Sequence, residues 1–152
     1  MESRWLANAI VATGMILLVG VAGYAGEKRS EPSSDPRQKV VLARAERDKV
    51  LAEMRQMLGS ISGILHALVA NDMPAIEKAA RISGMEKAAD PQLKKKLPET
   101  FLQLGMQTHK GFDELADQAK PGGTREDVLK RLAGLSNNCV GCHASYRIDE
   151  AR

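Results

Sequence analysis

The stretch Asn138-Cys139-Val140-Gly141-Cys142-His143-Ala144-Ser145-Tyr146-Arg147 lies near the end of the 152-residue chain, and the rest of the sequence can be organised around it. It holds both cysteines of the protein, separated by two residues, and a histidine follows directly. This C-x-x-C-H pattern is typical of covalent c-type haem attachment. Two thiols one helical turn apart can bond to the two vinyl groups of a porphyrin, and the adjacent imidazole can become the proximal iron ligand. The motif therefore predicts one haem c held by Cys139, Cys142 and His143.

Three other uses of a C-x-x-C pair agree less well with the sequence. A redox-active dithiol is expected near a βαβ pattern, and no strand-like alternation surrounds this motif. A structural zinc site needs two further ligands, and the remaining histidines are His66 and His109. A disulfide between these cysteines would close a ring of a few residues and would restrain little of the unfolded chain.

Composition favours an all-α fold. Aromatic residues make up only 3% of the chain, whereas Ala, Leu, Met, Lys, Glu and Arg are abundant, which favours helices over a sheet. The net charge of +3 is too small to indicate nucleic-acid binding, although it can bias docking toward an acidic redox partner. No catalytic triad, phosphate loop or paired carboxylate pattern stands out, so we expect a protein that is not an enzyme.

The first 26 residues predict a segment that enters or crosses a membrane. No charged residue lies between Trp5 and Gly26. The small-x-small sequence Gly23-Tyr24-Ala25 suits cleavage of a secretory signal before Gly26. The apolar length, about 20 residues, also suits a retained transmembrane anchor with aromatic residues at its two ends. Both interpretations stay open, and a polar linker at residues 27–35 follows the segment.

The domain of residues 36–152 contains four amphipathic segments. Asp35-Pro36 resembles a helix start, and the first helix would run to about Ala70. Its apolar residues recur at steps of four and three, a spacing suited to a bundle core: Val50, Met54, Met57, Ile61, Ile64 and Leu68.

The three later helices are separated by strong stop signals. Asp72 and Pro74 begin the second helix, which we expect to end near Gly84. A short lead-in at Asp90-Pro91 precedes the third helix, at about residues 98–119, and Lys120-Pro121-Gly122-Gly123 ends that helix. A capping box at Thr124 begins the last helix. In the first and last helices we call the row of residues at steps of four and three, which would face the bundle core, the seam. The seam of the last helix is Val128, Leu132, Leu135, Cys139, Cys142 and Tyr146. Short connections then predict an antiparallel four-helix bundle.

The C-x-x-C-H-x-x-Tyr-Arg ending of the fourth helix resembles that of class II c-type cytochromes, the cytochrome c-prime family, over about residues 36–147. The resemblance implies thioether bonds at Cys139 and Cys142 and a proximal ligand at His143. It also implies that Arg147, one helical turn further on, and its neighbour Tyr146 lie near the haem. An ordinary solvated helix end is the alternative for these last two residues. Members of the family are periplasmic, and a homodimer is one option.

The resemblance also indicates where a second axial ligand could come from. Low-spin members use a methionine of the first helix, and the seam places Met54 at that position, with Met57 one turn on. High-spin members leave the iron five-coordinate, and they carry an arginine where this chain has Val50. Two alternatives remain for Met54: methionine at helical spacing is often core filler, and counting back from Pro74 places Arg55 there instead. Of the other histidines, we expect His66 to be exposed, and His109 is a remote candidate ligand.

These observations predict a periplasmic mono-haem c-type cytochrome that carries one electron at a time. Its N-terminal helix would tether it to the inner membrane near membrane-bound redox proteins, or it would be soluble in the periplasm after cleavage. The alternative function is a five-coordinate haem protein that binds nitric oxide or carbon monoxide.

Overall fold

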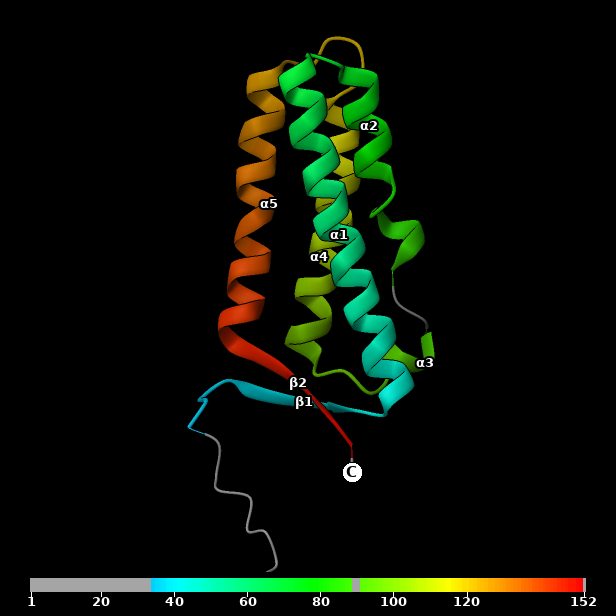
Figure 1. The fold of residues 1–152 in the computed structure, drawn as a ribbon, viewed down its shortest axis with the longest axis vertical. Helices are drawn as coiled ribbons and strands as arrows, with labels where there is room; N and C mark the ends of the chain where they lie inside the picture. Colours follow the sequence, from blue (N-terminus) through cyan, green and yellow to red (C-terminus); the bar gives the residue numbers. More distant parts are fainter. Residues whose placement is uncertain (1–33, 89–90, 152) are drawn as a thin grey trace, which may run out of the picture. The chain divides into compact units, whose positions relative to one another are not determined.

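A computed structural model describes residues 34–88 and 91–151 (Figure 1). The predicted N-terminal signal or membrane helix lies outside these residues. Within the described ranges, no helix is both long enough and apolar enough to cross a membrane. The chain is mostly helical, as the composition predicts. Its elements are β1 (Gln38–Leu42), α1 (Arg44–Ala70), α2 (Met73–Arg81), the 3-10 turn η1 (Met85–Lys87), α3 (Pro91–Lys94), α4 (Glu99–Gln118), α5 (Arg125–Ser145) and β2 (Tyr146–Glu150).

The helices α1, α2, α4 and α5 lie alongside one another, and each runs opposite to the one before it (Figure 1). The closely packed helix pairs are α1 with α2, α2 with α4, and α4 with α5. Helices α1 and α5 are not among the closely packed pairs of the described residues. Helices α1 and α4 are likewise not among these pairs.

Two helix starts follow the predicted capping signals. The Asp72 side chain accepts a hydrogen bond from the Ala75 backbone N–H at 2.9 Å, with Pro74 in the first turn of α2. The Thr124 hydroxyl oxygen accepts one from the Asp127 N–H at 3.1 Å at the start of α5. Each cap satisfies a backbone donor that has no partner within the helix. The predicted C-cap at Gly84 is wrong, because α2 ends at Arg81.

The predicted helix start at Asp35-Pro36 is also wrong, because a strand occupies the first part of that segment. Asp35 Oδ1 accepts a hydrogen bond from the Arg37 N–H at 3.0 Å, which is a local turn and not a helix cap. Val40 and Leu42 are then buried, while Val41 between them is 56% exposed. This alternation places β1 with one face on the core, and α1 begins only at Arg44.

The strand β1 pairs in parallel with β2, a short sheet that the composition did not predict. The register runs from Gln38 opposite Tyr146 to Leu42 opposite Glu150. The prediction that the last helix continues through Tyr146 is therefore wrong. Tyr146 is buried, and its ring meets that of Phe101 edge to face with the centroids 5.3 Å apart. This packing and the pairing with β1 replace another turn of helix.

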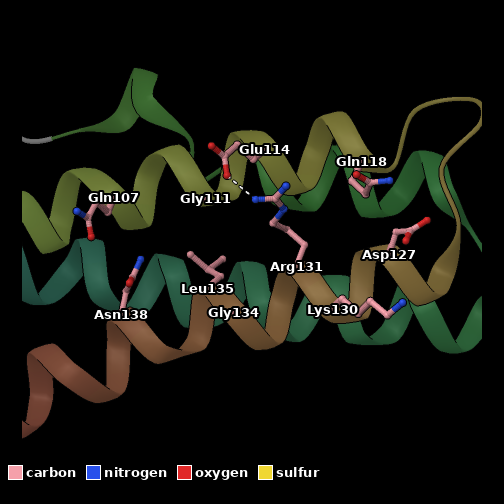
Figure 2. A pocket seen from close by; sticks show the side chains of 10 residues that line it. All are labelled: Gln107, Gly111, Glu114, Gln118, Asp127, Lys130, Arg131, Gly134, Leu135 and Asn138. Atoms are coloured by element: carbon pink, nitrogen blue, oxygen red, sulfur yellow. Dashed lines mark hydrogen bonds and ion pairs between the residues drawn. The ribbon is translucent and has the colours of Figure 1, made fainter.

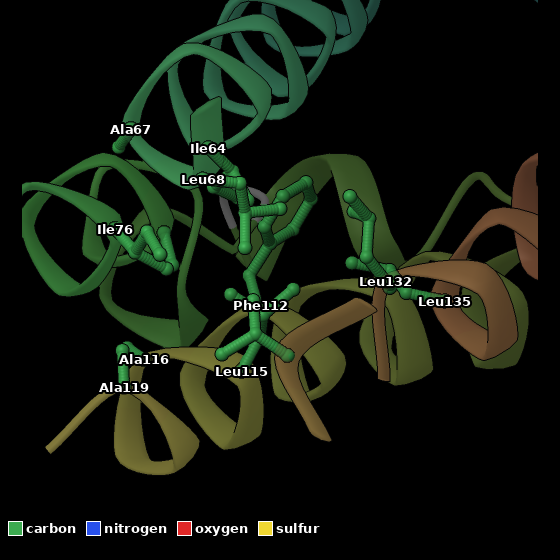
Figure 3. Packing of buried hydrophobic residues seen from close by; sticks show 12 residues of the cluster. Ile64, Ala67, Leu68, Ile76, Phe112, Leu115, Ala116, Ala119, Leu132 and Leu135 are labelled. Atoms are coloured by element: carbon green, nitrogen blue, oxygen red, sulfur yellow. The ribbon is translucent and has the colours of Figure 1, made fainter. Parts of the chain in front are cut away.

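The buried residues form two clusters. The larger cluster joins α1, α2, α4 and α5 around Phe112 (Figure 3), and Phe112, Leu115 and Val128 have no exposed surface. Burying a large apolar side chain stabilises a fold by about 1.5–3 kcal/mol. The smaller cluster lies at the sheet end: Val40, Leu42, Val50, Leu93, Phe101 and Tyr146.

Candidate functional site

A mostly apolar cavity of about 600 Å³ is lined by residues of α1, α4 and α5. Its size lies within the range of about 300–1,000 Å³ that is typical of ligand and cofactor pockets. Its lining residues are Val50, Leu51, Glu53, Met54, Arg55, Met57, Leu58 and Ile61 of α1; Leu97, before α4; Phe101, Leu102, Leu104, Gly105, Met106, Thr108 and His109 of α4; and Cys139, Val140, Cys142 and His143 of α5.

The α1 wall of the cavity is the middle of the predicted apolar seam. Val50 at the start of this seam and Ile64 and Leu68 at its end are buried. Met54, Met57 and Ile61 between them are only half-buried, and all three line the cavity. The helix therefore presents apolar side chains to a space that other side chains do not fill. A seam interrupted in this way indicates a place for an apolar ligand, because protein interiors otherwise pack to high density.

The α5 wall carries the complete motif, because Cys139, Cys142 and His143 all line the cavity. Positions i, i+3 and i+4 share one face of a helix, so the spacing alone predicts this arrangement. The two thiols are free and half-buried, and burial raises the pKa of both Cys139 and Cys142. Redox-active dithiols need a lowered thiol pKa, so these surroundings do not favour that alternative.

Methionines approach the cavity from two helices. Met54 and Met57 line it from α1, and Arg55, the residue given by the alternative alignment, lines it as well. Met106 of α4 is a further lining residue that sequence reasoning missed. The apolar face expected for this helix consists of Phe101, Leu104, Thr108, Phe112 and Leu115. Met106 lies off that face, so its spacing gave no signal.

His109 is held by protein groups on both sides of its ring. The side chain is buried, with Nδ1 2.8 Å from the Ser83 carbonyl oxygen and Nε2 2.8 Å from Glu53 Oε1. The contact to Glu53 has the distance of an ion pair but not the alignment of a hydrogen bond. Burial lowers the pKa of His109, but Glu53 and the backbone near Ser83 outweigh it, so the net pKa is raised. His66 is exposed, as expected.

Tyr146 and Arg147 are not among the residues that line the cavity. Tyr146 lies behind the wall, packed against Phe101. Arg147 belongs to β2, not to a further helical turn, and its guanidinium lies 3.7 Å from Asp35 and 3.8 Å from Asp149. A contact of either residue with a bound group stays a prediction.

A second hollow, of about 480 Å³, is lined by α4 and α5 (Figure 2). Its lining is largely polar, and an ion pair of 2.8 Å between Arg131 and Glu114 spans it. Neither cysteine and no histidine lines it. The apolar cavity is therefore the candidate site.

Across the described residues, no three side chains of the His, Cys, Asp and Glu types come together as a metal site. Comparison of the chain with protein-family models, with curated proteins and with solved structures finds no match.

Proposed function

We propose that the cavity holds one haem, attached through Cys139 and Cys142 with His143 as an axial ligand, and that the protein carries single electrons in the periplasm. One observation carries the proposal: the C-x-x-C-H motif lies in the wall of a mostly apolar cavity of about 600 Å³. A motif without a cavity would have no room for a porphyrin, and a cavity without the motif could hold many ligands.

The lining of the cavity fits this group. A porphyrin is broad and largely apolar, and Val50, Phe101 and Leu104 would surround it with hydrocarbon and exclude water. The cavity is lined by α1, α4 and α5, and within the described residues α1 is closely packed with neither of the other two helices, so the bound group would supply packing among the three. We therefore propose that α1, α2, α4 and α5 form an antiparallel four-helix bundle of the class II cytochrome type.

Met54 is the residue that we propose as the second axial ligand. It lies on α1, and the motif lies on α5 in another wall of the same cavity. A thioether is a soft, neutral ligand that raises the reduction potential of haem iron. Met57, one turn further along α1, is the alternative.

Bound haem supplies the one-electron chemistry, and the chain supplies binding, orientation and shielding. The sulfurs of Cys139 and Cys142 would hold the group in place, and His143 and Met54 would bind its iron. If residues 1–26 are retained as a membrane anchor, they would hold the domain close to membrane-bound redox partners and raise their effective concentration.

The test is to express the chain in cells that mature c-type cytochromes. We expect a red protein that keeps its colour after acid-acetone extraction, and a colourless protein when both cysteines are changed to serine. A colourless wild-type protein would overturn the proposal. The ferric spectrum then decides the role: a low-spin spectrum supports the electron carrier, whereas a high-spin spectrum with rapid carbon monoxide uptake on reduction supports the gas-binding alternative.

A further inference from the structure

The segment of residues 35–42, here named the strap, crosses the end of α5 that carries the attachment motif. Its strand β1 pairs with β2, which begins three residues after His143. The pairing is reinforced by a hydrogen bond of 2.8 Å from the Ala151 N–H to the Leu42 carbonyl oxygen. The strap therefore holds the chain that leaves the helix directly after the motif.

One contact reaches the motif itself. The guanidinium group of Arg37 donates a hydrogen bond from Nη1 to the backbone carbonyl oxygen of His143, at 3.3 Å. Carbonyl groups in the last turn of a helix lose their helical donors. Because α5 ends at Ser145, the His143 carbonyl lies in that turn. A positive group at a helix C-terminus is also favoured by the helix dipole.

Asp35 orients the guanidinium for this contact. Its carboxylate accepts from Arg37 Nε at 3.0 Å and from Nη2 at 2.7 Å, which is the two-point geometry that arginine forms with carboxylates. Nη1 is thereby left pointing at His143. The hydrogen bonds from Arg37 lower the pKa of Asp35 to about 2, so the carboxylate is charged at neutral and mildly acidic pH.

We propose that Asp35 and Arg37 are positioning residues for the axial ligand, because they clamp the His143 backbone and thereby fix how its imidazole enters the cavity. This inference rests on the proposed function. In metal sites, groups that orient the ligating residues are often worth 10–100-fold in metal affinity. Here the orienting groups act through the backbone of the histidine. They lie near His143 in space but near the other end of the domain in sequence.

The experiment compares Arg37→Gln with Arg44→Gln in the full-length haem-loaded protein. Arg44 is the matched control, because it lies just after β1 and its Nε pairs with Glu150 at 2.9 Å at the far end of the sheet. Each variant removes one arginine–carboxylate ion pair near the sheet. Only Arg37→Gln also removes the hydrogen bond to the His143 carbonyl oxygen. Acid titration followed by absorption measures the pH at which the histidine leaves the iron, and circular dichroism measures helix content in the same samples.

For Arg37→Gln we expect the histidine to leave the iron at a pH higher by about one unit, a tenfold weaker bond, with unchanged helix content. Arg37→Lys, which keeps a charged donor but loses the two-point pairing with Asp35, should fall between wild type and Arg37→Gln. Arg44→Gln should titrate like wild type. Equal titration of Arg37→Gln and Arg44→Gln in red protein would overturn the positioning role alone, whereas a colourless wild-type protein would overturn the proposed function and this inference with it.

Discussion

Replacing Gly105 by alanine tests whether a bound group fills the cavity. Gly105 lies within α4 and lines the cavity, and a Cβ added there would meet no atom of the chain within 4 Å. Gly59 of α1 has equally open space but does not line the cavity. The two glycines thus differ in whether a ligand bound in the cavity would lie beside them.

Helix propensity sets the expected magnitude. Alanine is favoured over glycine in a helix interior by about 0.8–1.0 kcal/mol, which raises the melting temperature of a domain of this size by about 4 °C. Gly59→Ala should show this full gain in the haem-loaded protein. Gly105→Ala should show no gain or a loss, because its new methyl group would press on the bound group. Gly105→Leu should block haem incorporation altogether.

Thermal unfolding followed by circular dichroism at matched haem content measures the two alanine variants, and haem absorbance per mole of protein measures the leucine variant. The reasoning fails if Gly105→Ala stabilises the protein as much as Gly59→Ala does and Gly105→Leu takes up haem at the wild-type level. That outcome would mean that the bound group lies elsewhere.

Three further predictions concern the ligand, the core and the buried histidine. Met54→Ala should remove the far-red absorption band of a methionine–iron bond, and a persisting band would assign the ligand to Met57 or another residue. Phe112→Ala should lower the free energy of unfolding by about 3–5 kcal/mol in urea titrations, because its ring has no exposed surface, and a loss below about 1 kcal/mol would contradict the described core. The raised pKa of His109 stabilises the fold fully below the unfolded-state pKa, about 6.5, and this contribution should disappear as the pH rises through the raised value. His109→Gln should remove this pH dependence from the free energy of unfolding measured between pH 5 and 9. If the free energy still changes with pH as in the wild type, other groups cause the pH dependence.

Local signals in the sequence predicted the main helices and predicted that the residues of the C-x-x-C-H motif share one helix face. The helix starts at Asp72 and Thr124 depend on residues only a few positions apart, so the sequence alone was sufficient to predict them. The spacing of Cys139, Cys142 and His143 likewise determines that they share one helix face, and the structure places all three at the cavity.

Features that depend on contacts between distant segments could not be predicted in this way. The start of β1 looked like a helix start, because an aspartate before a proline is compatible with either structure, and the choice is made by pairing with β2. Because Tyr146 pairs with Gln38 in the sheet, the last helix ends at Ser145. The contacts of His109 could not be predicted either, because Glu53 and Ser83 are distant from it in the sequence.

The pairing of β1 with β2 has a consequence for the proposed haem attachment. These strands lie at opposite ends of the described domain in sequence, so their contact closes a loop that contains α1 to α5 and costs the conformational entropy of that loop. If haem is attached as proposed, we expect the thiols to be more accessible to an attachment enzyme before this contact forms than after it. A chain truncated after His143 would keep the entire motif but lack the strand that completes the fold around it.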